Sequence, residues 1–380
     1  MRKARYLLSV ILAVLVLTAC TGSGGAAGSS SASASVTSPA ETADSSSAET
    51  TSEPDSVQVG VILPTMREPR WLQDESAFAE LLPDAGFTCE VMFSDGSMEM
   101  ERANVEALAD KGAEVIILCT CDSAAAAESV SGMKERGVTV IAYDRLITGT
   151  EDVDYFVTFD SFDVGKAQGN YLLEHAPQGK GIPLYLYGGA VADNNSFLLF
   201  EGAWSVLQPR IADGTFVIQN SAAADSLRAK KELTREETEI VLQEITTDWN
   251  FSVAGTLAEN NLAEADTKKG EVLILAPNDS TARAIADCFA GDEEVSGYVI
   301  TGQDAEAASI KYIIEEKQSM TVFKNPHTLA GSAVRMAAGL LNGKTPETDS
   351  VYPNGVKDVP ALELPIEVID RSNAENMNNS

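Results

Sequence analysis

Residues 138–147 read VTVIAYDRLI, and this stretch decides the fold. A run of β-branched and apolar residues, typical of a buried strand, ends abruptly in Tyr143, Asp144 and Arg145. In open α/β sheets, ligands bind just beyond the carboxyl ends of parallel strands, so polar side chains placed there are candidates for ligand contact. The stretch therefore predicts a buried strand that ends at a binding site.

Apolar segments of strand length alternate with amphipathic segments of helix length from Val57 onward. Five predicted strands precede Asp160, and a second series follows it. Such alternation predicts βαβ units with parallel sheets. With 380 residues, 44% of them hydrophobic, the chain can form two cores. The predicted fold class is α/β, with two doubly wound parallel-sheet lobes joined by a multi-strand hinge around an interlobe cleft.

The expected lobes are each built from two parts of the chain. We assign residues 57–160 and 304–345 to the first lobe, and residues 161–303 and 346–372 to the second. Residues 224–248 interrupt the regular spacing with a charged, helix-prone insert. We expect this insert to be a solvated surface excursion.

The first 20 residues have the features of a lipoprotein signal peptide. Three basic residues precede an apolar run from Tyr6 to Leu17, which is too short to span a membrane comfortably. The sequence Leu-Thr-Ala-Cys at 17–20 resembles the lipobox of bacterial lipoproteins, which makes Cys20 the expected lipid anchor. The alternative is an ordinary cleaved signal with a chance cysteine. Residues 21–56 are mostly Ser, Ala, Gly, Thr and Glu, and predict a flexible tether.

The charge and the metal-ligating residue types exclude several classes of function. A formal net charge of −30 argues against a nucleic-acid partner, because phosphates would be repelled. Neither histidine, His175 or His327, lies near a cluster with metal-ligand spacing, so we expect no metal and no cofactor. After Cys20, four cysteines follow, and we expect buried thiols in strands rather than disulfides: Cys89, Cys119, Cys121 and Cys288.

Polar residues follow six of the predicted strands. Carboxylates accept hydrogen bonds, arginine donates in a fixed fork and asparagine does both, a combination that suits a neutral, polyhydroxylated ligand. Trp71 and Trp249 could supply flat apolar walls for a sugar ring. Asp193 and Asp279 could instead cap helices, and Trp204 reads as a core residue. Recurrence of this chemistry at successive strand ends favours a binding cleft.

Several of these motifs together resemble a known family. The chain looks like the xylose-binding and multiple-monosaccharide-binding receptors of bacterial ABC importers, within the type I periplasmic binding protein superfamily. The resemblance runs from about Val57 to Ile369. It rests on Arg70-Trp71, AYDR at 142–145, YFVTFD at 155–160, DNN at 193–195, PND at 277–279, GQDA at 302–305 and TVFK at 321–324.

The resemblance implies a pyranose held between the lobes by particular residues. Trp249 is the expected second stacking tryptophan, although Asn250-Phe251-Ser252 departs from the family's usual continuation there. Tyr143 is expected to pack or to belong to the hinge, because alternation along its strand points it away from Asp144. The implied ligand-binding residues are Arg70, Trp71, Asp144, Arg145, Asn195, Trp249, Asn278, Asp304 and Lys324.

The function that these features indicate is that of a solute-binding lipoprotein, not an enzyme. It would bind an aldose such as xylose, glucose or galactose outside the cytoplasm, anchored to the cell membrane, and deliver it to an ABC transporter permease. A sugar receptor for chemotaxis or two-component signalling would use the same cleft. A secreted glycoside-active enzyme would need an acid/base carboxylate pair, and a sugar-responsive repressor would need a basic helix-turn-helix region in place of the signal and tether.

Overall fold

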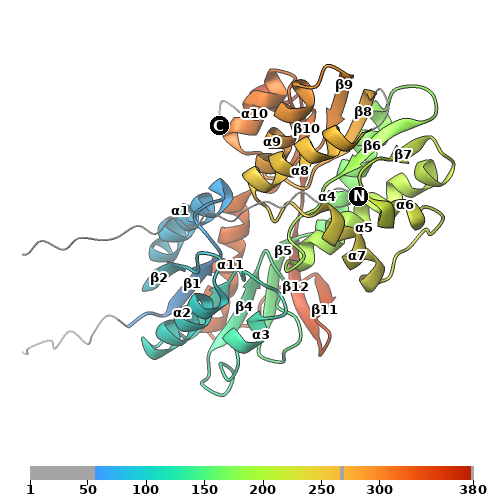
Figure 1. Cartoon of the computed structure of the whole chain (residues 1–380). Coiled ribbons are helices and arrows are strands. Elements are labelled where there is room, and N and C mark those ends of the chain that lie inside the picture. The colour runs from blue at the N-terminus through green and yellow to red at the C-terminus, as the bar shows by residue number, and fades with distance from the viewer. Residues whose placement is uncertain (1–55, 266–268, 378–380) are drawn as a thin grey trace, which may run out of the picture. The chain divides into compact units, whose positions relative to one another are not determined.

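The computed structural model of the protein describes residues 56–265 and 269–377. The predicted signal peptide, Cys20 and residues 21–55 of the predicted tether lie outside these ranges. The first lobe contains seven strands, β1 (Val59–Leu63), β2 (Cys89–Phe93), β3 (Val115–Leu118), β4 (Thr139–Tyr143), β5 (Tyr155–Phe159), β11 (Ser350–Pro353) and β12 (Asp358–Leu364). Its helices are α1 (Pro69–Asp84), α2 (Met98–Asp110), α3 (Ala126–Ser129) and α11 (Pro326–Leu341) (Figure 1).

The second lobe holds the rest of the described elements. Its strands are β6 (Ile182–Leu186), β7 (Phe216–Ile218), β8 (Gly270–Leu275), β9 (Val295–Ile300), β10 (Met320–Phe323) and β13 (Glu367–Asp370). Its helices are α4 (Ser161–His175), α5 (Asn194–Ala212), α6 (Ala222–Ser226), α7 (Arg235–Ile245), α8 (Phe251–Glu264), α9 (Asp279–Ala290), α10 (Ala307–Ile314) and α12 (Ala374–Met377).

Each lobe is built on a doubly wound sheet, so the predicted fold class is confirmed. The first sheet has the order β11-β12-β5-β4-β3-β1-β2 and is parallel apart from β11. The second has the order β7-β6-β8-β9 and is parallel throughout. β10 and β13 form a separate antiparallel pair. In both sheets the carboxyl ends of the parallel strands share one edge.

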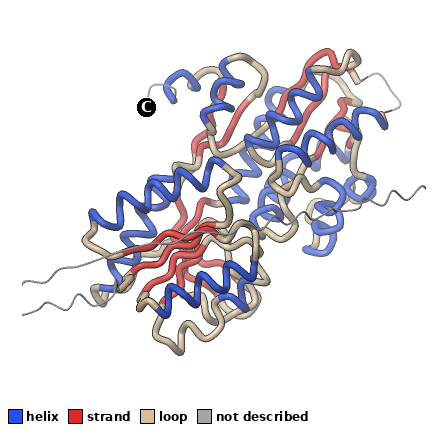
Figure 2. Tube along the Cα trace, turned by 60° about the vertical axis from the view of Figure 1, so that its left-hand side comes forward, coloured by secondary structure: helices blue, strands red, loops and turns tan. Residues whose placement is uncertain are grey.

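Helices cover both faces of the first sheet, which explains why its strands are apolar at nearly every position. In β1, Val59, Val61 and Leu63 pack with α1 and α11, whereas Ile62 packs with α2 on the opposite face. Figure 2 shows the strands of this sheet side by side between helices. The second sheet is covered in the same way, by α5 and α7 on one face and by α8 and α9 on the other.

Strand pairing corrects the predicted lobe boundaries. β12 pairs in parallel with β5 of the first sheet, and β10 pairs with β13 in the second lobe. Assigning all of 304–345 to the first lobe was therefore wrong for α10 and β10, and assigning 346–372 to the second was wrong for β11 and β12. An apolar run identifies a strand but not its neighbours, because pairing partners lie far apart in sequence. The chain crosses between lobes after β5, after β10 and after β12.

The insert at 224–248 is only partly the solvated excursion that we expected. Its helix α7 buries Val241, Leu242 and Ile245 in the core of the second lobe, against α5. Trp204 is buried there, as predicted, and its Nε1 donates to the backbone oxygen of Lys230 at 3.0 Å. The apolar residues of α7 lie on one side of this amphipathic helix and face the core. The number of charged residues in the insert therefore did not predict this contact with the core.

The four cysteines in the described residues are free thiols. Cys89 lies in β2, as expected for a strand residue, but the predicted strand position was wrong for the other three. Cys119 and Cys121 follow the end of β3, and Cys288 lies in α9. Cys119 is fully buried, whereas the other three are half-buried.

Helices α4 and α5 approach closely enough that glycine is required at the contact. A Cβ on Gly165 of α4 would lie 2.0 Å from the backbone oxygen of Leu199. A Cβ on Gly202 of α5 would lie 2.0 Å from the backbone oxygen of Phe162. Backbone atoms cannot move aside as a flexible side chain can, so the two helices are held at a fixed spacing. Their first turns carry Ser161 and Asn195.

We expect Gly165→Ala and Gly202→Ala each to lower the free energy of unfolding by about 3 kcal/mol, because the added methyl group must displace backbone. Gly339→Ala in α11 is the matched control. A Cβ there meets nothing within 4 Å, so alanine should stabilise the helix by about 0.5–1 kcal/mol. Urea denaturation of the three variants measures both effects. Equal stability of all three would contradict the close helix contact.

Candidate functional site

The structure brings all nine predicted ligand-binding residues to one cavity at the carboxyl ends of the strands. We call this the inner cavity. Its volume is about 20 Å³, enough for one or two water molecules, because side chains from both lobes nearly fill it. The lining comprises the nine predicted residues, Arg70, Trp71, Asp144, Arg145, Asn195, Trp249, Asn278, Asp304 and Lys324, together with Glu68, Ser161, Asp193, Leu199 and Gln303.

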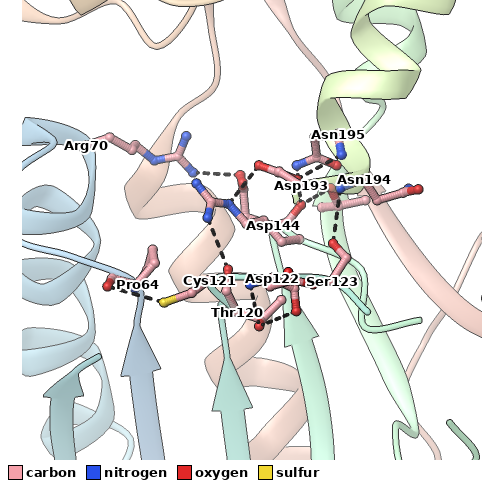
Figure 3. A network of polar contacts seen from close by, with 12 residues as sticks. Pro64, Arg70, Thr120, Cys121, Asp122, Ser123, Asp144, Asp193, Asn194 and Asn195 are labelled. Carbon is pink, nitrogen blue, oxygen red and sulfur yellow. Dashed lines mark hydrogen bonds and ion pairs between the residues drawn. The ribbon is translucent and has the colours of Figure 1, made fainter. Parts of the chain in front are cut away.

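Arg70 connects carboxylates from both lobes. Its Nε lies 2.6 Å from Asp74 Oδ2 on α1, and its Nη2 lies 3.1 Å from Asp144 Oδ1 at the end of β4. Its Nη1 lies 3.3 Å from Oδ1 of Asp304, which follows β9 in the second lobe. Lys324 Nζ lies 3.1 Å from the same Asp304 oxygen and 3.9 Å from Asp144 Oδ1. Figure 3 shows Arg70 pointing toward Asp144.

The charges around Asp144 keep it ionised. Burial alone would raise its pKa, but Lys324, Arg70 and Arg145 together outweigh burial and lower the pKa. Asp74 behaves differently, since burial raises its pKa despite the neighbouring Arg70. Asp144 is therefore a hydrogen-bond acceptor in the cleft and is poorly suited to donating a proton.

Arg145 and Trp71 form the first-lobe wall of the cavity. Arg145 Nη1 donates to the backbone oxygen of Thr120 at 3.1 Å. Its Nε lies 2.9 Å from Asp193 Oδ2, an ion pair that lacks hydrogen-bond alignment. The guanidinium carbons of Arg70 and Arg145 each lie 5.2 Å from the centroid of the Trp71 ring, within range of a cation–π interaction. Trp71 Nε1 is buried and makes no hydrogen bond within the described residues.

Polar contacts across the cleft join the loop after β3 and the end of β4 to the start of α5. Asn195 Nδ2 donates to the backbone oxygen of Asp144 at 2.8 Å. Ser123 N donates to Ala192 O at 2.9 Å, and Asn194 N donates to Ser123 Oγ at 3.1 Å. Figure 3 shows Asn195 and Asn194 approaching from the helix above Asp144 and Ser123. The lobes are thus held together at this point by direct hydrogen bonds.

Three of the cavity residues have left-handed backbone conformations. The φ angles are 60° at Asp144, 55° at Trp249 and 95° at Asp304. Such angles are costly for residues other than glycine and cluster at functional sites. All three side chains line the inner cavity, so the residues with this costly backbone conformation are concentrated at the candidate site.

Trp249 is positioned by the insert that precedes it. After α7 ends at Ile245, Thr246 Oγ1 donates to Gly189 O at 2.8 Å and Thr247 N donates to Gly188 O at 2.8 Å. The Trp249 ring then lies against Gly189, where a Cβ would sit 2.1 Å from Cζ2. The insert therefore supports the second-lobe wall of the cavity.

Asp279 lies beneath the cavity and supports Asp304 without lining the cavity. Its Oδ2 accepts from Glu306 N at 2.8 Å and its Oδ1 accepts from Gln318 Nε2 at 2.8 Å. Burial raises its pKa well above the usual range. Asn278, one residue earlier, is the N-cap of α9. Asp279 therefore holds the loop that carries Asp304, a role that the sequence did not reveal.

Five lining residues were missed by the sequence analysis. Gln303 directly precedes Asp304, Asp193 begins the DNN motif that contains Asn195, and Ser161 directly follows the YFVTFD motif. Leu199 lies one helical turn after Asn195, so the positions of these four residues could have been inferred. Asp193 also caps α5, since its Oδ1 accepts from Asn195 N at 2.9 Å. Glu68 precedes α1 and is half-buried. Burial raises its pKa to about 7, with Arg145 opposing the shift.

Tyr143 packs away from the cavity, as predicted. It is fully buried, its hydroxyl donates to Asp74 Oδ1, and its ring meets Phe78 edge-on. Within residues 56–265 and 269–377, no group of three or more His, Cys, Asp or Glu side chains could hold a metal ion. No helix in the same ranges is long and apolar enough to cross a membrane.

Known proteins share both the sequence and the fold. A carbohydrate transporter solute binding protein from Chloroflexus aurantiacus, solved in complex with D-glucose, is 53% identical, with 84% of this chain and 94% of that chain covered and a TM-score of 0.82. A solute binding protein of an ABC transporter from Clostridium phytofermentans, with bound β-D-glucose, is 26% identical, with coverages of 84% and 96% and a TM-score of 0.74.

A curated relative and a family comparison agree with these structures. The multiple sugar-binding periplasmic protein SbpA of Azospirillum brasilense is 32% identical over 332 residues, which cover 84% of this chain and 87% of the relative. Residues 59–345 match the family described as "Periplasmic binding protein domain", which is most of the chain. The doubly wound lobes, the cleft between them and these matches together show that the chain belongs to the periplasmic binding protein family.

Proposed function

We propose that the protein binds a monosaccharide in the inner cavity and delivers it to the permease of an ABC transporter. One observation carries the proposal: nine hydrogen-bonding and aromatic side chains from both lobes converge on one cavity. The sugars named for the similar solute binding proteins support an aldose as the ligand class. The similar proteins are transport receptors, and we assign no catalytic step to the cleft.

The donors and acceptors of the inner cavity match the needs of a sugar ring. Asp144 and Asp304 accept from hydroxyl groups, while Arg70 and Lys324 donate to hydroxyl oxygens. The apolar face of a pyranose would lie against Trp71 or Trp249, whose Nε1 atoms are buried and make no hydrogen bond among the described residues. Selectivity would follow hydroxyl stereochemistry, because a missing hydroxyl leaves a buried partner unsatisfied.

Ligand entry requires the lobes to separate. An inner cavity of about 20 Å³ is too small for a pyranose, and the Arg70–Asp304 and Asn195–Asp144 contacts span the cleft. Three chain crossings between the lobes provide a hinge, so a sugar can enter an open form and replace part of these interlobe contacts on closure. The permease would recognise the closed, loaded form.

A thermal-shift and calorimetric screen of aldopentoses, aldohexoses and uronic acids tests this proposal. We expect at least one neutral aldose to bind. Trp71→Ala and Asp304→Asn should weaken that sugar at least about 100-fold, because each removes a buried contact. Asparagine is chosen at position 304 because it tolerates a positive φ better than alanine does.

Exposed Asp213 in the second lobe provides the control, since Asp213→Asn removes a carboxylate that does not line the inner cavity. This variant should bind the sugar as the unsubstituted protein does. If Trp71→Ala and Asp304→Asn retained full affinity, the assignment of the inner cavity would be wrong. If no sugar bound, the proposed ligand class would be wrong.

Glu68 adds a titratable group to this site. Its pKa of about 7 in the folded protein exceeds the 4.5 of an unperturbed glutamate. Between these two values the folded state binds more protons than the unfolded state, so this residue makes stability fall as pH rises through that window. Below it, both states carry the proton. Above it, Glu68 is ionised in both states, and the loss of folding stability is complete. This loss is at most about 3 kcal/mol, and it is smaller than that because Glu68 is only half-buried.

Glu68→Gln should therefore gain stability relative to the unsubstituted protein as pH rises from about 4.5 to 7. The difference in melting temperature between the two proteins should widen across this window and then level off. Glu80→Gln, which removes an exposed carboxylate from α1, is the control for loss of one charge. If the difference in melting temperature between Glu68→Gln and the unsubstituted protein stayed the same at every pH, the raised pKa would be ruled out.

The lipid anchor at Cys20 is a separate part of the proposal. It rests on the Leu-Thr-Ala-Cys motif and lies outside the described residues. A lipid on Cys20, followed by the Ser-, Ala- and Gly-rich segment, would keep the sugar-binding lobes near the membrane outside the cytoplasm. Such tethering raises the local concentration of the receptor at its permease.

We expect Cys20→Ala to abolish incorporation of radiolabelled palmitate and to leave the protein out of the washed membrane fraction. Cys89→Ala is the control, because Cys89 lies in β2 of the folded body. Labelling of the Cys20→Ala variant at the level of the control would refute the anchor. Sugar binding by either variant should stay unchanged, because neither cysteine lines the inner cavity.

A further inference from the structure

A second cavity adjoins the inner cavity. Its volume is about 370 Å³, and its lining includes Arg67, Glu68, Arg145, Asp248, Trp249 and Phe251. We call it the outer cavity. Glu68, Arg145 and Trp249 line both cavities. A molecule in the inner cavity could therefore extend past these three side chains into the outer one.

The outer cavity has room for one more sugar ring. Its 370 Å³ lies in the range of cavities that hold small organic ligands, whereas the inner cavity has about 20 Å³ when the lobes are in contact. A single hexose that fills an enlarged inner cavity would leave the outer one to water. The available volume is thus larger than a monosaccharide requires.

The lining of the outer cavity suits a neutral, hydroxylated ligand. Phe251, the first residue of α8, is 51% exposed, and Trp249 lies two residues before it. Aromatic rings pack against the C–H faces of sugars. Thr65, Asn250 and Ser252 provide hydroxyl and amide groups for hydrogen bonds.

Charged side chains of both signs line the outer cavity. Arg67 and Arg145 are opposed by Glu68 and Asp248. An anionic or cationic extension would meet charges of its own sign on one side, while a neutral glycosyl group would not. Charge and aromatic content therefore favour a second neutral sugar unit over a phosphate or a carboxylate.

We propose that the outer cavity is a second saccharide subsite, which lets the protein bind a neutral disaccharide with one ring in each cavity. This inference rests on the proposed function, because the inner ring is held by the monosaccharide site. The three shared side chains, Glu68, Arg145 and Trp249, surround the glycosidic link. The second ring contacts Phe251 and the polar groups at the start of α8.

Substitutions at the start of α8 separate the two subsites. Ser252 lines only the outer cavity, and its hydrogen bond to Asn250 Oδ1 uses the backbone N–H, so Ser252→Trp should fill the cavity without disturbing the helix. Val253 is 39% exposed and lines neither cavity, so Val253→Trp is the matched control. Phe251→Ala removes the exposed aromatic wall.

The test is calorimetric titration of the full chain with glucose, galactose and xylose and with maltose, cellobiose, gentiobiose, melibiose and xylobiose. We expect at least one disaccharide to bind within about 10-fold of its component monosaccharide. Mass spectrometry of the sugar released from the complex must show the intact disaccharide. Ser252→Trp should weaken that disaccharide at least about 10-fold and Phe251→Ala about 3-fold, with monosaccharide affinity changed less than 2-fold. Val253→Trp should change neither.

Two results would overturn the inference while leaving the proposed function intact. The first is binding of monosaccharides with no binding of any disaccharide. The second is an equal loss of monosaccharide and disaccharide affinity in Ser252→Trp, which would place that residue's effect on the inner site. If no mono- or disaccharide bound, the proposed function itself would fail, and the outer subsite with it.

Discussion

The closed cleft depends on the buried guanidinium group of Arg70. Its three carboxylate partners come from α1, from the end of β4 and from the loop after β9. A buried arginine without such partners would cost several kcal/mol. Asp74 and Asp144 neutralise Arg70 within the first lobe, and the contact with Asp304 adds an ion pair to the second lobe. The same guanidinium group therefore orders the first-lobe side of the cavity and joins it to the second lobe.

The charges that line the inner cavity are nearly matched. Three cations, Arg70, Arg145 and Lys324, face Asp144, Asp193 and Asp304, with Glu68 as the remaining acid. Burial holds the pKa of Glu68 at about 7, so near neutrality it is partly protonated. A neutral ligand leaves this balance undisturbed, whereas an ionic one would leave a buried charge without a partner. The electrostatics of the cavity thus restrict the ligand class before any single hydrogen bond is considered.

Much of the fold and most of the residues of the inner cavity could be predicted from the sequence, for a physical reason. Parallel strands end at a common edge, so polar residues after successive strands meet in space, and the position of Asp144 after VTVIAY was informative by itself. Lobe membership after residue 304 was predicted correctly for α11 and β13 but not for α10, β10, β11 and β12, because strands are assigned to a lobe by pairing partners that lie far away in the sequence. The supporting role of Asp279 was also hidden, since its contacts to Glu306 and Gln318 form only in the folded chain.

The left-handed backbone at Asp144, Trp249 and Asp304 has a consequence for how the protein evolves. A residue other than glycine in that conformation costs roughly 1–2 kcal/mol, and aspartate costs less. At Asp144 and Asp304 the ion pairs with Arg70 offset this cost, so these two aspartates serve the fold as well as the ligand. Trp249 Nε1 makes no hydrogen bond among the described residues, so ligand binding is the main reason to keep a tryptophan in that conformation. Position 249 is where a descendant that lost its ligand would be expected to change first.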